Sequence, residues 1–326
     1  MAGNTATRTY TIKKRKIPKV GEIVNYTPDT PSTGYDLSTA KSGYSSAQTI
    51  DGKYDPTTWK IMEVDENGNI TKLLGIGAKT VYFAGATGYN NGVYLLNDIC
   101  KSRYRNASLG ATARSLNIED IESRMNATGI AARNAYKNGT VQYGTTKKCT
   151  TRGHTKYPAI YAQEKYSGIN VSDVADGTQV ITGSVNATAQ AKMNPNGKTQ
   201  SEDVYTAATT DTSKTDATSL TCTQTYYRFE STPSSYFDDT NFHSMIFGTR
   251  TSFWLASRYV NCNSNYSNAF GLRIVDNSSL FGNYLFDSYG YSGSNSNRLA
   301  PVVSLGSGIK VKSGSGTTRD PYVIGK

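Results

Sequence analysis

Cysteine and histidine, which carry much of the chemistry of metal and thiol enzymes, are scarce in this sequence. Its 326 residues include four widely separated cysteines and only two histidines, His154 and His243, neither of them near a nucleophile pattern. The cysteines form no C-x-x-C pair, which excludes the common zinc and redox motifs. A G-x-S-x-G elbow is absent, and segment 75–80 lacks the spacing of a phosphate loop. We therefore expect a protein that is not an enzyme, with no catalytic residue, no metal and no cofactor.

The cysteines themselves are expected to be free thiols. Cys149 and Cys222 flank a polar middle segment, so a disulfide between these two is the alternative. Cys100 falls in an apolar helical pattern, and Cys262 lies within a polar run near the C-terminus.

Long apolar runs are also missing. No segment approaches the roughly 20 apolar residues that a membrane-spanning helix needs. No apolar segment follows the basic cluster near the start, as it would in a secretory signal peptide. The sequence as given is therefore expected to be soluble, with no membrane insertion.

Charged residues make up 18% of the chain, and the net charge of +10 is unevenly distributed. Six positive charges precede the first acidic residue, Glu22, and removing these six from +10 leaves +4. We expect residues 1–19 to form a basic extended arm and residues 20–326 to form the folded part. Because the basic residues gather in an arm rather than along a groove, we do not expect nucleic-acid binding. The six are Arg8, Lys13, Lys14, Arg15, Lys16 and Lys19.

The most distinctive stretch of the sequence spans residues 253–305. Between Tyr259 and Arg298, 21 of 40 residues are Asn, Ser or Tyr. Tyrosine offers a large contact area with few rotamers to freeze, and serine and asparagine offer adaptable hydrogen bonds. This composition is typical of a binding surface.

Apolar residues run through the same stretch at strand-like spacing, which distinguishes it from a disordered tract. It opens on Phe-Trp-Leu at 253–255 and closes on the apolar run 301–305. We expect these residues to be a rigid frame that carries an outward polar set. The frame residues are Trp254, Phe270, Leu272, Ile274, Leu285, Val302 and Val303.

The opening FWLASRYV, the run of Asn, Ser and Tyr, and the closing RLAPVVSL resemble the variable region of diversity-generating retroelement target proteins of phages and gut bacteria. In that family an error-prone reverse transcriptase varies adenines, which converts Asn codons into many others but not into Lys or Glu codons. The sequence agrees, since no Glu follows Glu230 and no Lys lies between Lys214 and Lys310.

The resemblance implies an α+β protein with a C-type-lectin-like fold, of a subclass close to the formylglycine-generating enzyme. It implies a strand hairpin, two helices and a C-terminal variable region of strands and loops, here with a long polar insertion at 126–242. The oxidase chemistry of that enzyme would need a copper-binding cysteine pair, and Cys262 is the one cysteine after Cys222. Calcium-dependent sugar binding would need a carboxylate-rich loop, whereas the variable stretch has only Asp276 and Asp287.

The function that the resemblance implies is diversified ligand or receptor binding by the variable region. The ligand would be a protein or a surface glycan on another cell, and the protein would sit on a phage tail or fibre or on a bacterial surface, with assembly into a homo-oligomer compatible with either. The alternative is a non-catalytic structural or decoration module of a virion or appendage. The residues expected to contact the ligand are Asn261, Asn263, Asn265, Ser267, Asn268, Asp276, Asn277, Asn283, Tyr284, Asp287, Tyr289, Tyr291, Asn295 and Asn297.

The rest of the chain gives local signals. Apolar alternation on both sides of Asn67-Gly68 predicts a hairpin with a type I′ turn over 59–74. Helical periodicity predicts helices over 90–105 and 115–125, the second capped by Asn117. A short strand is expected after Val20, a loop over 27–56, and a terminal hairpin or strand extension over 306–326.

Overall fold

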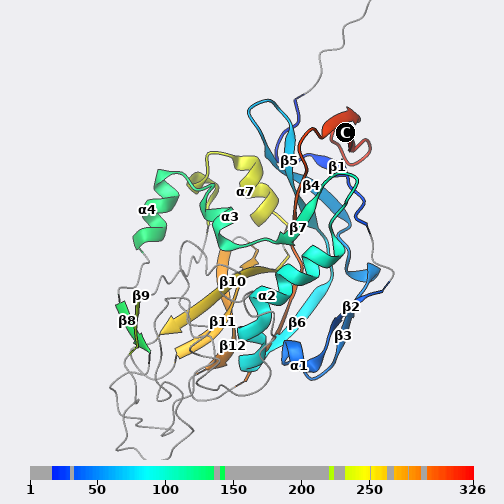
Figure 1. The fold of residues 1–326 in the computed structure, drawn as a ribbon. Coiled ribbons are helices and arrows are strands. Elements are labelled where there is room, and N and C mark those ends of the chain that lie inside the picture. Colours follow the sequence, from blue (N-terminus) through cyan, green and yellow to red (C-terminus); the bar gives the residue numbers. More distant parts are fainter. Residues whose placement is uncertain are drawn as a thin grey trace, which may run out of the picture.

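The computed structural model describes residues 17–29, 33–135, 140–143, 220–223, 232–249, 251–262, 268–277, 279–287 and 292–326. Within these ranges the protein is an α+β structure built on two large β-sheets and a long helix, as expected for its class (Figure 1). No helix in these ranges is both long enough and apolar enough to cross a lipid bilayer.

The larger sheet brings the two ends of the folded chain together. Its strand β16 pairs antiparallel with β15 and parallel with β1, so the expected terminal hairpin is confirmed and gains a partner from the start of the chain. Across the sheet the order is β15 (Lys310–Ser313), β16 (Tyr322–Gly325), β1 (Ile23–Asn25), β4 (Thr58–Val64), β5 (Ile70–Ile76), β14 (Pro301–Ser304) and β7 (Thr112–Ser115).

The smaller sheet contains most of the Asn-, Ser- and Tyr-rich stretch. Its central strand β10 is antiparallel to β11 and meets β13 in parallel at one register pair. The order of strands is β12 (Ser279–Asp287), β11 (Asn268–Asp276), β10 (Phe253–Cys262), β13 (Ser294–Arg298) and β6 (Thr80–Ala84).

Helices and two short hairpins complete the described structure. The hairpins are β2 (Tyr35–Leu37) with β3 (Gln48–Ile50), and β8 (Thr140–Tyr143) with β9 (Leu220–Thr223). The helices are α1 (Thr39–Ser42), α2 (Gly85–Arg103), α3 (Ile118–Glu122), α4 (Ala127–Ala135) and α7 (Thr240–Phe247), with the 3-10 helices η1 (Gly52–Tyr54) and η3 (Ser234–Tyr236).

The predicted hairpin is strands β4 and β5, but the type I′ turn is wrong. Gly68 N donates to Asp65 O, and Asp65 N donates to Asn69 O, with Gly68 at φ 76°. Asn67 is not in the left-handed region that a type I′ turn requires. The connection is instead a turn followed by a left-handed glycine, and it is stabilised by the Asp65 carboxylate, which accepts from the backbone of Asn67 and Asn69.

Both predicted helices are present. Helix α2 begins at Gly85, five residues before the expected start, because strand β6 leads directly into it. Helix α3 is short and has the expected cap, in which Asn117 Oδ1 accepts from Asp120 N and the Asp120 carboxylate accepts from Asn117 N. Glu122, its last residue, is only 8% exposed.

Regular structure also forms where loops were expected. The segment 27–56 contains β2, α1, β3 and η1. The expected insertion 126–242 starts with α4 and ends with η3 and the beginning of α7. Phe237 and Phe242 from its end are buried in the core that also holds Phe253 and Val275.

Helix α2 joins the two sheets through a shared core. Val93, Leu96 and Ile99 lie at helical spacing and pack with Trp254 of the smaller sheet. One position further, Cys100 packs with residues of β4 and β5 in the larger sheet. Trp254 is fully buried and its indole Nε1 donates to Val81 O at 2.9 Å, so the expected frame residue sits at the centre of the smaller sheet.

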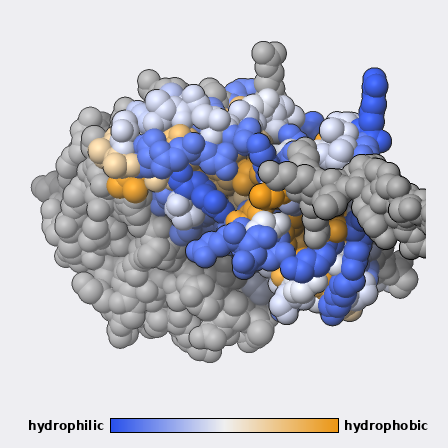
Figure 2. All heavy atoms as spheres, turned by 90° about the horizontal axis from the view of Figure 1, so that it is seen from above, coloured by the Kyte–Doolittle hydropathy of each residue, from blue (hydrophilic) through white to orange (hydrophobic). Residues whose placement is uncertain are grey.

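Few large hydrophobic side chains are exposed among the described residues. On the face seen from above in Figure 2, hydrophobic residues lie between hydrophilic ones. The large hydrophobic side chains that remain exposed are Ile17, Ile130, Tyr284 and Val323, and of these Tyr284 belongs to the candidate site.

Arg103, the last residue of α2, is almost fully buried and is held by polar partners. Its Nη2 and Nε donate to Asp55 Oδ1 at 2.8 and 3.3 Å, and its Nη1 donates to Ile50 O at 2.9 Å. A buried guanidinium is tolerated only when its donors are satisfied in this way. The contact fixes the end of α2 against β3 and η1.

We expect Arg103→Ala to lower the free energy of unfolding by about 3 kcal/mol, because Asp55 and the Ile50 carbonyl lose their donors inside the protein. Lys53→Ala is the control, since the nearby Lys53–Asp51 pair is largely exposed and its loss should leave the unfolding midpoint nearly unchanged. Urea unfolding of the purified variants measures both. Equal effects of the two substitutions would contradict the structural role of Arg103.

Candidate ligand-binding surface

Strands β10, β11 and β12 form an antiparallel meander. Cys262 pairs with Asn268, and Ala269 pairs with Asp287, so β10 ends, β11 begins and β12 ends at the same end of the sheet. We call it the distal end of the smaller sheet. The tight turn after Asp276 lies at the opposite end.

Both faces of the meander are covered over much of its length. Leu272 and Ile274 pack in the core that contains α2, whereas Val275 and Leu280 pack in the core that contains α3 and α7. Arg273, which lies between them on β11, is fully buried. Alternation of apolar and polar residues predicted one solvated face, and the structure instead shows a sheet enclosed on both sides.

A β-bulge on β12 changes this pattern near the distal end. Phe270 pairs with Phe286 and Gly271 pairs with Tyr284, so Leu285 is an extra residue on β12. Leu285 is fully buried, while Tyr284 is 44% exposed. Gly271 permits the close approach, since a Cβ there would lie 2.1 Å from Asn283 O. Tyr284 is thus exposed directly before the bulge, while its neighbour Leu285 lies in the core.

Strand β13 meets β12 at this bulge. Ser292 bridges Phe286, and Gly293 N donates to Leu285 O at 2.9 Å. The Asn295 side chain donates from Nδ2 to Tyr284 O at 2.5 Å. The structure thus brings together three of the predicted contact residues, Asn283, Tyr284 and Asn295. Tyr284 is exposed, and the two asparagines are half-buried.

Asp276 and Asn277 lie at the other end of the sheet. Asp276 Oδ1 accepts from Ser252 Oγ at 2.5 Å and from Asn277 Nδ2 at 3.2 Å, and Asn277 has φ 53°. Seven residue steps separate them from the distal end, roughly 23 Å at the rise of a strand. These two residues shape a turn and are not part of the cluster around Tyr284.

Asn297 was also predicted to point outward, but in the structure it is buried. It is 3% exposed, and its Nδ2 has no hydrogen-bond partner among the described residues. It pairs across to Val81, which is buried in the core under the sheet. The physical reason is the alternation of β13, which turns Asn297 inward where the apolar residues of β6 also point.

The remaining predicted residues are not placed in detail. Asn261, Asn268 and Asp287 lie on strands β10, β11 and β12 near the distal end, and their side chains are outside the description. Five further predictions fall outside the described residues, namely Asn263, Asn265, Ser267, Tyr289 and Tyr291. The alternative Cys149–Cys222 disulfide is untested because Cys149 lies outside the described residues. The side chain of Cys262 is outside the description, and Cys100 is a free thiol.

Sequence reasoning missed strand β6 as a neighbour of this surface. The run Thr-Val-Tyr-Phe-Ala at 80–84 has strand-forming composition, which could have predicted the strand. Nothing in the sequence predicts its pairing with β13, where Tyr82 lies opposite Ser296 and Ala84 opposite Ser294. The pairing adds residues outside 253–305 to the neighbourhood of the candidate surface.

The described residues contain no cluster of metal-ligating side chains. No group of three or more His, Cys, Asp or Glu side chains among them is close enough to hold a metal ion. Burial raises the pKa of the Cys100 thiol well above its usual range, which disfavours the reactive thiolate. His243 lies between the rings of Phe237 and Phe247, with Nε2 2.7 Å from Thr232 O, and so serves packing.

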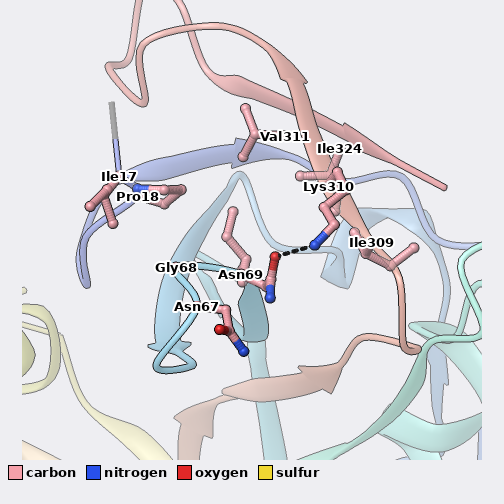
Figure 3. Close-up of a pocket in the computed structure, with 10 residues that line it drawn as sticks. Ile17, Pro18, Asn67, Gly68, Asn69, Ile309, Lys310, Val311 and Ile324 are labelled. Carbon is pink, nitrogen blue, oxygen red and sulfur yellow. Dashed lines mark hydrogen bonds between the residues drawn. The ribbon is translucent and has the colours of Figure 1, made fainter. Parts of the chain in front are cut away.

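A cavity of about 180 Å³ lies elsewhere, on the larger sheet (Figure 3). It is lined by the turn of the β4–β5 hairpin, by residues around β15 and by Ile17 and Pro18, and Lys310 Nζ donates to Asn69 Oδ1 at 2.6 Å beside it. This volume is below the range of typical small-molecule sites. The cavity is separate from the surface around Tyr284.

Comparison of this chain with protein-family models, with curated proteins and with solved structures gave no match.

We expect Asn297→Asp to destabilise the protein by about 2 kcal/mol or more, because a carboxylate would be buried where an amide already lacks a partner for Nδ2. Asn297→Leu should cost much less, since it removes a buried polar group. The matched control is Ser294→Asp, at an exposed position three residues away on the same strand. Thermal and urea unfolding compare the three variants. An Asn297→Asp variant as stable as the parent would contradict the interior placement.

Proposed function

We propose that this protein is a ligand-binding receptor whose 253–305 stretch is diversified by a retroelement on a fixed C-type-lectin-like scaffold. The observation that carries the proposal is the division of that stretch into two sets. Its apolar members Trp254, Leu272, Leu285 and Val302 are fully buried, whereas Tyr284 is 44% exposed. A scaffold of this kind keeps its core while its outward residues change.

The order of elements supports the proposed scaffold. A hairpin, β4–β5, is followed by helices α2 and α3 and then by strands β10 to β14, the order that the resemblance implies. The retroelement part of the proposal is supported by the sequence, through the Asn, Ser and Tyr composition and the absence of Lys and Glu between Glu230 and Lys310.

The proposed mechanism is recognition without catalysis. Tyr284 supplies a large ring that loses little entropy on binding, and the polar side chains near it supply hydrogen bonds that adapt to the ligand. Asn295 holds the backbone of Tyr284 and so positions its ring. The setting we propose is a phage tail or a bacterial surface, where the ligand is carried by another cell.

Deep sequencing of the native locus across a population tests the proposal. We expect substitutions to cluster at adenine-containing codons around the bulge, such as those for Asn283, Tyr284 and Asn295, next to a template repeat and a reverse transcriptase gene. The codons for Trp254 and Leu272 should stay constant, because their loss would cost about 3–5 kcal/mol of stability. An invariant stretch with no template repeat nearby would reject diversification and favour a fixed decoration module.

A further inference from the structure

Tyr44 and Tyr82 form a stacked aromatic pair beside the candidate surface. Their ring centroids are 4.7 Å apart with an interplanar angle of 23°. Both side chains are half-buried, so part of each ring faces solvent. Tyr82 lies on β6, and Tyr44 follows the C-terminus of α1, so neither belongs to 253–305.

The strand register places this pair next to the outward side of β13. On β6, Val81 and Phe83 are fully buried in the core, so Tyr82 points to the other face. Tyr82 pairs with Ser296 and Ala84 pairs with Ser294, which puts both serines on the same face as Tyr82.

This face continues to Tyr284. The bridge from Ser292 to Phe286 and the bond from Gly293 N to Leu285 O set β13 antiparallel to the end of β12, which brings Ser294 next to Tyr284 in the ladder. Tyr82, the two serines and Tyr284 therefore follow one another across β6, β13 and β12, with Tyr44 stacked on Tyr82.

The segment that carries Tyr44 is fixed at both ends. Gln48 Nε2 donates to Tyr82 O and Gln48 Oε1 accepts from Tyr82 N, both at 2.9 Å. At the other end, Gly43 has φ 70° and approaches so closely that a Cβ would lie 2.1 Å from Ala84 O. The stacked pair is thus held in place before any ligand arrives, which reduces the entropy lost on binding.

We propose that Tyr44 and Tyr82 are a constant aromatic anchor of the ligand-binding surface, and that the ligand it contacts is a protein. This inference rests on the proposed function. Because the pair lies outside the diversified stretch, it would contribute the same contact area to every variant, while Tyr284, Ser294 and Ser296 would set specificity. Tyrosine and serine side chains are the chemistry that paratopes use against protein surfaces.

A library selection tests the anchor. Residues Tyr284, Ser294, Asn295 and Ser296 are randomised in the full-length chain, displayed on yeast, and selected on hen egg lysozyme as a defined protein probe. Tyr44→Ser and Tyr82→Ser are then introduced separately into about ten selected clones. We expect the Kd for lysozyme to rise at least tenfold in most clones, whatever their selected sequences, because aromatic anchors dominate such interfaces.

Tyr236→Ser is the matched control. Tyr236 is also a half-buried tyrosine, and it lies in η3, which contacts α4 and α7 on the side of the molecule away from α1 (Figure 1). It should leave the Kd within about twofold. Tyr44→Phe keeps the stacked rings and should also leave the Kd within about twofold. Thermal unfolding of each variant separates a binding loss from a folding loss, and Tyr44→Ser leaves strand β6 itself unchanged.

The outcomes separate the two proposals. If binders are selected and neither serine substitution weakens them more than Tyr236→Ser does, the anchor is rejected while the receptor function stands. If the intact library yields no lysozyme binder although its members fold, the surface is not a protein-binding site, and both proposals are overturned. Loss of affinity confined to the two serine variants supports both.

Discussion

The packing of helix α2 against both sheets is the constraint on which the rest of the structure depends. One side of the helix buries Val93, Leu96 and Ile99 against the smaller sheet, and its last turn reaches the hairpin of the larger one. A hydrogen bond also links the helix to the larger sheet, since Asn97 Oδ1 accepts from Ser115 N of β7. Because one rigid element sets the distance between two sheets, the meander β10–β12 has a fixed base from which its distal end projects.

The candidate surface lies beside a local irregularity in that base. Up to Tyr284 the pairing of β12 with β11 is regular, and Tyr284 lies on the same face of the strand as Leu280. The bulge at Leu285 follows directly, so the exposed Tyr284 and the fully buried Leu285 are neighbours in the chain. Exposed residues of this short stretch can therefore be substituted while its buried residues, and with them the core, stay unchanged.

Local chemistry explains what could be predicted from the sequence. The Asn67-Gly68 hairpin and the Asn117 cap of α3 depend on residues a few positions apart, and both are present, although the turn type was wrong. Pairings between distant residues could not be predicted, such as β6 with β13 across some 200 residues. For the same reason the burial of Arg273 and Asn297 was missed, because their enclosure depends on helices and strands from elsewhere in the chain.

The side chain of Gln48 has a consequence for solubility. Strand β6 is the last strand of its sheet, and an open edge offers unpaired backbone groups on which another chain can add as a strand. By bonding to both backbone groups of Tyr82, the Gln48 amide occupies the middle of that edge. If the neighbouring surface changes its sequence by chance, some variants will be prone to edge-to-edge aggregation. A blocked edge, encoded outside the changing stretch, would protect every variant alike.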